Sequence, residues 1–168
     1  MLTWQADLSA VLRGRIAADF LLTGAGTRIE ARGWKSFFGF GVTDATGRAG
    51  SELLALVPNA LDCRGNASVA ISEITAGRTA VRASGEIRTS NAVCRTLGQD
   101  EVTVRPLVIA LSSEDNDAVA RIATETGDRL GEVRVKPARR VLIRIEPDGA
   151  RLIPGLPASA PTEIELPF

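Results

Sequence analysis

Histidine and tyrosine are both absent from the 168-residue sequence. Without histidine, Ser-His-Asp and Cys-His arrangements cannot form, and His-based general acid–base catalysis is excluded together with most zinc and haem sites. Chemistry by two carboxylates would need no histidine, but the sequence does not place a pair of acids in a pattern that suggests it. We therefore predict a protein that is not an enzyme and that uses no cofactor and no metal ion.

An excess of charge and long apolar runs are also missing. The 20 basic and 20 acidic residues cancel, which does not support a general attraction to nucleic acid. No apolar run approaches the roughly 20 residues of a membrane-spanning helix. The opening "MLTWQADLSA" lacks the basic start and long apolar stretch of a signal peptide. We expect an upstream segment to precede Met1.

The composition is that of a globular protein, with 45% hydrophobic and 24% charged residues. The length suggests one domain followed by a tail. We place the domain at residues 1–153. The proline-spaced tail, residues 154–168, is expected to be extended.

Short segments with period-two alternation recur between turn signals. Ile16, Ala18, Phe20 and Leu22, for example, share one face of a single segment. We predict a mainly β protein with an antiparallel curved sheet, a half-barrel or a sandwich of about 8–10 strands. One short helix is expected near residues 51–57, capped by Ser51. Pro106 lies in a long apolar segment and suggests an edge strand or a bulge.

The two cysteines, Cys63 and Cys94, are the residues whose chemistry is most open. A nucleophile would have no histidine to activate it, and a metal site would have two thiols without C-x-x-C spacing. A disulfide between them in an oxidising compartment is the favoured arrangement, with two free thiols as the alternative.

The strand register makes this disulfide conditional. A two-residue turn at Ala76-Gly77 would place Cys63 opposite Ser90, and Cys94 lies four residues further along, roughly 13 Å away. A disulfide requires Cα atoms within about 7 Å. The bond therefore requires the chain near Gly65 to leave the hairpin, or a bulge to shift the register.

Four other motifs have a functional and a structural interpretation. "EDND" at residues 114–117 could bind a cation, but it lacks EF-hand spacing and is expected to be a solvated loop. "GFGVTDATG" at 39–47 resembles a phosphate loop without its lysine, and we predict a bulged strand. "RVKPARR" at 134–140 could touch anionic lipid or a partner, but a charged hairpin tip that protects a sheet edge is favoured. Asn66-Ala67-Ser68 fits a glycosylation sequon that is common by chance.

Several segments, in order, resemble the type II secretion system protein N family. "WQADLSAVLRGRI" (residues 4–16) matches a W-x-x-x-L-x-x-L-L-x-G-R-I pattern, and residues 40–71 match a strand, a D-x-x-G turn, a leucine-rich helix and a returning strand. "SGEIRTSNAVC" (84–94) and residues 120–150 are similar to the G-x-(I/L)-x-W-x-N-A segment and the P-D-G ending of the family. The resemblance is to its periplasmic part.

The resemblance implies a non-enzymatic component of the machine that exports folded proteins from the periplasm. Such a protein is anchored in the inner membrane, with the anchor outside this chain, and works through contacts with other components. The secretin, the inner-membrane platform and the cargo are the expected contacts. A strand edge near Pro106 or the tail could bind them by strand addition.

A different function remains open from the residues themselves. Curved sheets with one apolar concave face can carry lipid chains between membranes. Strands around Phe20, Leu22, Val81 and Ile87 could line such a groove, or they could simply form the core. Co-purifying acyl lipid would favour the groove.

Overall fold

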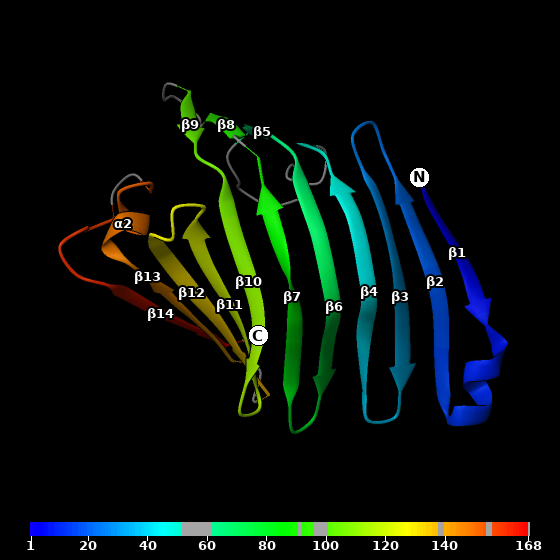
Figure 1. Cartoon of the computed structure of the whole chain (residues 1–168). Coiled ribbons are helices and arrows are strands. Elements are labelled where there is room, and N and C mark those ends of the chain that lie inside the picture. Colours follow the sequence, from blue (N-terminus) through cyan, green and yellow to red (C-terminus); the bar gives the residue numbers. More distant parts are fainter. Residues whose placement is uncertain (52–61, 91, 96–100, 138–139, 154–155, 168) are drawn as a thin grey trace.

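One large antiparallel sheet dominates the computed structural model (Figure 1). The structure describes residues 1–51, 62–90, 92–95, 101–137, 140–153 and 156–167. The sheet has eleven strands in the order β1-β2-β3-β4-β6-β7-β10-β11-β12-β13-β14. Their bounds are β1 Leu2–Asp7, β2 Arg15–Thr23, β3 Arg28–Ser36, β4 Gly39–Ala49, β6 Ala67–Gly77, β7 Val81–Thr89, β10 Leu107–Glu114, β11 Asp117–Thr124, β12 Arg129–Lys136, β13 Arg140–Ile145 and β14 Thr162–Pro167.

A smaller sheet lies at one end of the large one. It consists of β5 (Asp62–Arg64), β8 (Ala92–Arg95) and β9 (Val102–Val104), in the order β5-β8-β9. The described helical segments are the 3-10 helix η1 (Leu8–Arg13) and the single turn α2 (Pro147–Ala150). The prediction of a mainly β, antiparallel, curved sheet is confirmed. Apart from Ser51, the helix predicted near 51–57 lies outside the described residues.

The strand register explains why these segments form a sheet with two unlike faces. Directly opposed residues of an antiparallel pair point to the same face. Trp4, Phe20 and Ala31 therefore share a face, and so do Phe40, Ala76 and Val81 further along. The same face continues through Leu111, Ala120, Val133, Ile143 and Ile164. One side of the whole sheet is thus lined by apolar residues, and we call it the apolar face.

A β-bulge keeps the apolar face continuous. Asp44 has a positive φ of 53°, and the register between β3 and β4 shifts at this point. A second shift occurs between β6 and β7 at Ser72, in the row opposite Asp44. An extra residue reverses the alternation of a strand, so Val42 and Ala45, although three residues apart, both point to the apolar face. The predicted bulged strand at 39–47 is confirmed.

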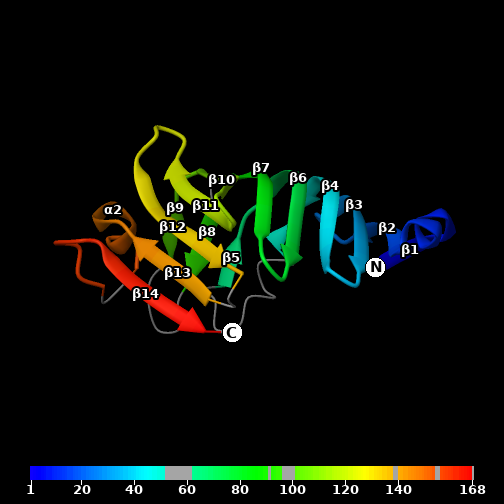
Figure 2. The same cartoon turned by 90° about the horizontal axis from the view of Figure 1, so that it is seen from below.

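The buried core lies where the sheet bends. Val81, Ala83 and Ala118 are buried together, with Leu111 and Val135 packed against them. All five lie on the apolar face by register, although β7 and β11 are not neighbours in the sheet. Figure 2 shows the strands after β10 curling out of the line of β1–β7. The curvature therefore makes the apolar face concave and buries its middle.

Two local expectations are wrong. Pro106 lies between β9 and β10, and it divides the predicted long strand because proline cannot donate a ladder hydrogen bond. β10 pairs with both β7 and β11 and is not an edge. The β6–β7 turn is at residues 78–80 instead of Ala76-Gly77, with the Gly77 N–H donating to the Ala80 carbonyl oxygen at 2.9 Å.

Candidate functional site

The concave apolar face extends across the eleven strands of the large sheet. Phe20, Leu22, Val81 and Ile87, the residues predicted to line a groove or form a core, all lie on it by register. Val81 is buried, whereas the other three are half-buried. Towards both sides of the sheet the face becomes exposed, at Trp4 and Phe40 on one side and at Ile164 and Leu166 on the other. The same face is therefore a core in its middle and an open surface at its margins.

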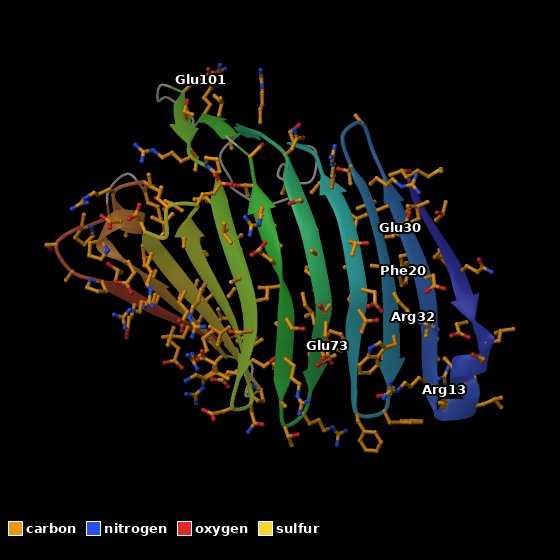
Figure 3. The ribbon with its side chains drawn as sticks, in the orientation of Figure 1. Arg13, Phe20, Glu30, Arg32, Glu73 and Glu101 are labelled. Atoms are coloured by element: carbon orange, nitrogen blue, oxygen red, sulfur yellow. The ribbon has the colours of Figure 1, made fainter. Side chains whose placement is uncertain are left out.

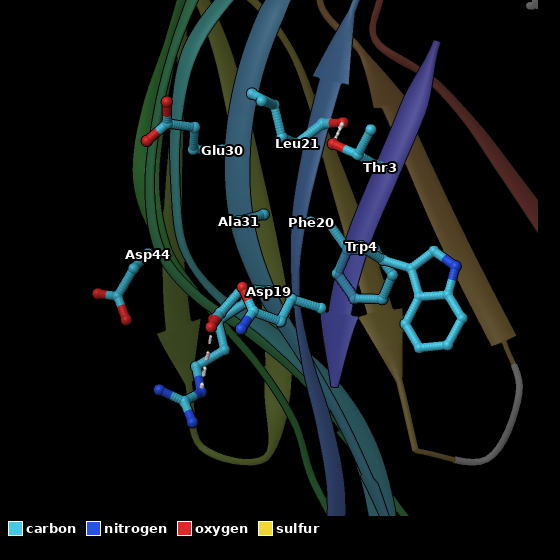
Figure 4. Close-up of a pocket in the computed structure, with 10 residues that line it drawn as sticks. Thr3, Trp4, Asp19, Phe20, Leu21, Glu30, Ala31 and Asp44 are labelled. Carbon is cyan, nitrogen blue, oxygen red and sulfur yellow. Dashed lines mark hydrogen bonds and ion pairs between the residues drawn. The ribbon is translucent and has the colours of Figure 1, made fainter. Parts of the chain in front are cut away.

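A charged hollow lies over β1–β4. Figure 4 shows its lining, and its volume is about 550 Å³. Asp19, Glu30 and Asp44 lie around it together with Arg32, whose Nε is 3.9 Å from the Asp19 carboxylate. Figure 3 shows where Phe20, Glu30 and Arg32 lie on the sheet. Arg32 also pairs with Asp7, so its charge is already compensated.

The two edge strands of the large sheet, β1 and β14, differ in how well they are protected against pairing with another chain. Natural edge strands are blunted by charged residues and proline. β14 carries Glu163, Glu165 and Pro167, which fits this pattern. β1, with the sequence LTWQAD, has its one charged residue at the last position and no proline, and Trp4 is 67% exposed. β1 is therefore the unprotected edge.

The hydrogen-bond pattern shows which backbone groups of β1 are available. The Thr23 N–H donates to the Met1 carbonyl oxygen at 2.9 Å, so Met1 and Thr23 are a hydrogen-bonded pair. Such pairs alternate along an antiparallel ladder, and the register Thr3↔Leu21 and Gln5↔Asp19 continues this set. The N–H and C=O groups of Leu2, Trp4 and Ala6 therefore point away from β2.

The start of η1 fixes the C-terminal end of β1. The Asp7 carboxylate accepts from the Ser9 N–H at 3.0 Å and from the Ser9 hydroxyl at 2.6 Å. These hydrogen bonds from Ser9, with the nearby Arg32 charge, lower the Asp7 pKa below its ordinary value. Asp7 therefore stays ionised and caps the helix.

The predicted solvated loop at 114–117 is a tight turn held by ion pairs. Glu114 ends β10 and Asp117 begins β11. Glu114 pairs with Arg121 and, at 2.7 Å, with Arg134. Hydrogen bonds from Arg121 and then Arg134 lower the Glu114 pKa. Its carboxylate is thus committed to arginine, and in the described part of the chain no group of three or more His, Cys, Asp or Glu side chains is arranged to hold a metal ion.

The segment 134–140 connects β12 with β13 within the sheet. The predicted hairpin is present, with Lys136 opposite Arg140. However, β12 also pairs with β11 and β13 with β14, so this hairpin does not protect an edge. Arg134 belongs to the ion pairs of Glu114, and Arg140 pairs with Glu165 at 3.4 Å. Residues 138–139 are outside the described residues.

Cys63 and Cys94 are directly opposed. β5 and β8 pair with Cys63 opposite Cys94, and not opposite Ser90 as a turn at Ala76-Gly77 would place it. The main ladder ends at Ala67↔Thr89, and β5 belongs to the separate small sheet, so the chain does leave the ladder at Gly65 as the prediction required. Opposed residues have Cα atoms about 4.5–5.5 Å apart, within disulfide range. The disulfide itself stays a prediction.

Comparison with known proteins gives one family. The family model for type II secretion system protein N matches residues 1–151. No curated protein and no solved structure matches the chain. Of the helices in the described residues, none has the length and apolar character needed to cross a bilayer.

Proposed function

We propose that this chain, which belongs to the type II secretion system protein N family, acts in the periplasm by binding another component of the secretion machine. The family supports a component of this machine in the cell envelope. The finer role rests on an exposed surface suited to protein contacts. The chain has no histidine, and the Glu114 carboxylate at the β10–β11 turn is paired with arginine. We therefore infer that the protein works without catalysis.

The observation that carries the proposal is the unprotected edge β1. Three residues, Leu2, Trp4 and Ala6, present outward backbone donors and acceptors, and two of them add exposed apolar side chains. A partner that adds a strand here would gain main-chain hydrogen bonds and bury Trp4. Trp is also the residue most enriched among interface hot spots. The tail, which we expected to be available, already forms β14 against β13, so we favour β1.

The secretin and the inner-membrane platform are the proposed partners. An anchor in the inner membrane, outside this chain, would hold the domain in the periplasm within reach of both. The division into a domain at 1–153 and a tail at 154–168 stays part of this proposal.

The test targets the outward backbone of β1. Ala6→Pro removes an outward N–H, whereas Ala6→Ser keeps it and serves as the matched control. Neither change removes a β1–β2 hydrogen bond, because Ala6 belongs to the non-hydrogen-bonded set. With the secretin and platform domains purified, we expect Ala6→Pro and Trp4→Lys to weaken binding at least tenfold, about 1.4 kcal/mol. Equal binding by Ala6→Pro and Ala6→Ser would contradict strand addition at β1.

The concave apolar face favours a second candidate function, the binding of lipid chains. The face is continuous through eleven strands and is exposed at Phe40 and Ile74, which a protein with a closed core would avoid. Native mass spectrometry and lipid extraction of the purified protein test this function. Stoichiometric acyl lipid, lost in a Phe40→Asp variant, would support it. Lipid-free protein that takes up no fatty acid would exclude it.

A further inference from the structure

Exposed apolar side chains gather at one end of the large sheet. They come from η1, from the start of β2, from the β3–β4 turn and from the start of β4. Leu12, Phe37 and Phe38 are 92%, 91% and 82% exposed. Val11, Ile16 and Phe40 are exposed as well. We call this surface the rim; it lies at the lower end of the sheet in Figure 1.

The register brings these segments together. Ile16 is opposite Lys35, and Lys35 is opposite Phe40. The next pair, Gly39↔Gly77, places the β3–β4 turn beside the β6–β7 turn. Phe37 and Phe38 form the tip of the β3–β4 turn, beyond the last ladder pair, so no neighbouring strand covers them. Their exposure follows from the topology.

The charged residues of the rim are all basic. Three adjoining hollows at this end, of about 590, 610 and 470 Å³, are lined in part by Phe37. Among their lining residues are six cationic side chains and no acidic one: Arg13, Arg15, Lys35, Arg78, Arg82 and Lys136. Both lysines of the chain are among them. For a protein with zero net charge, this separation is pronounced.

The cations of the rim are not neutralised within the described residues. Nine of the arginines elsewhere in the described chain pair with carboxylates, as Arg134 does with Glu114 and Arg144 with Glu163. None of the six rim cations is among the ion pairs of the described residues, and the Arg15 guanidinium instead lies over the Trp34 ring, 4.8 Å from its centroid. The acidic β10–β11 turn is close, since the Val81 N–H donates to the Asn116 carbonyl oxygen. There Glu114 and Asp117 face arginine, and Asp115 is exposed.

We propose that the rim docks on an anionic lipid membrane, with Phe37 and Phe38 entering the interfacial region and the basic side chains contacting lipid phosphates. Exposed aromatic and aliphatic side chains surrounded by Lys and Arg are the combination that binds such surfaces. A purely apolar protein partner would leave the cations unpaired, and a purely acidic one would leave Leu12 and the two phenylalanines uncovered. A bilayer surface satisfies both sets. This docking does not depend on the role of β1.

Vesicle flotation with the full chain tests the docking. The probes are phosphatidylcholine vesicles with and without about one third phosphatidylglycerol. Each basic residue near an anionic surface contributes about fivefold in affinity, so Arg13→Gln/Lys35→Gln/Arg78→Gln is expected to weaken binding about 100-fold. We expect Phe37→Ser/Phe38→Ser to weaken it at least about tenfold through lost apolar insertion. All five side chains are exposed, so the fold should be unaffected, and circular dichroism checks this.

A matched triple variant at the other end of the sheet separates docking from net charge. Arg28→Gln/Arg48→Gln/Arg64→Gln removes the same charge from exposed positions and should bind as the unaltered protein does. The proposal is overturned if the unaltered protein binds neither vesicle, if it binds neutral vesicles equally well, or if the control loses as much affinity as the rim variant. Unchanged binding by Phe37→Ser/Phe38→Ser would equally overturn it.

Discussion

The pairing of Cys63 with Cys94 leads to the most quantitative prediction. The two residues are directly opposed in β5 and β8, and a bond between them would close a loop of 32 residues, from 63 to 94. Replacing both with serine removes the cross-link and leaves the eleven-stranded sheet intact. In the loop-entropy description, the loss is about 3–4 kcal/mol of unfolding free energy.

This loss should appear as a large change in melting temperature. For a protein of this size, 1 kcal/mol corresponds to about 2–4 °C, so Cys63→Ser/Cys94→Ser should melt about 6–16 °C lower. Reductant should lower the melting temperature of the oxidised protein by a similar amount. The double variant should not respond to reductant, which makes it the internal control.

The assay is thermal unfolding of protein exported to an oxidising compartment, followed by circular dichroism with and without reductant. Maleimide labelling in urea, read by mass spectrometry, counts the free thiols. We expect no label before reduction and two labels after it. Two labels on the unreduced protein, or equal melting temperatures for the double variant and the oxidised protein, would refute the reasoning.

Three further predictions concern the sheet itself. Glu114 has a lowered folded-state pKa, so its contribution to stability is present above the unfolded-state pKa and is lost as pH falls through the folded-state pKa. In acid denaturation, Glu114→Gln should therefore flatten the dependence of unfolding free energy on pH in this range. An unchanged pH dependence would contradict the lowered pKa of Glu114. Gly47 has φ of +146°, and a Cβ there would overlap the Arg28 carbonyl oxygen. Gly47→Ala should therefore lower the free energy of unfolding in urea by about 2–3 kcal/mol. A loss under about 0.5 kcal/mol would contradict the close approach of the Gly47 and Arg28 backbones. Val119 is buried, with 1% exposure, so Val119→Ala should lower the free energy of unfolding by about 1–2 kcal/mol. A loss near zero, as for a substitution at an exposed position, would show that this side chain is not packed.

Much of the fold follows from period-two alternation. The segments around Ile16 to Leu22 and from Ile29 to Gly33 alternate clearly, and they form β2 and β3. The bulge could also have been placed more closely, because Val42 and Ala45, like Ile71 and Ile74, are three residues apart and mark a reversal of the alternation. Patterns of this kind report on neighbouring residues, and so they identify strands well.

The hairpin register could not be chosen from the pattern. Between the turn and the bulge at Ser72, the Ala76-Gly77 turn and the observed turn at 78–80 differ by four residues in pairing, and an even shift leaves the side chains there on their original faces. Burial therefore does not distinguish them. The Ala76-Gly77 turn would place Cys63 opposite Ser90, whereas in the structure Cys63 leaves that ladder and pairs with Cys94 in the small sheet. The cysteine pair was therefore open to prediction only in conditional form.

The rim was missed for a related reason. Phe37 and Phe38 directly precede the bulged strand predicted at 39–47, and the sequence does not show whether that strand includes them. In the structure β4 begins at Gly39, and the two side chains lie beyond the ladder. Strand ends are uncertain by a few residues from the sequence, and at this site that uncertainty separates a core residue from an exposed one. The basic residues come from distant segments that only the topology brings together.

Secretion in cells tests the central claim most directly. The gene for this chain is deleted, and export of a type II cargo enzyme is measured as the fraction in the medium and the fraction in the periplasm. The account predicts that cargo accumulates in the periplasm, that the unaltered gene restores export, and that Ala6→Pro restores less than Ala6→Ser. Normal export in the deletion strain would contradict a role for this chain in type II secretion.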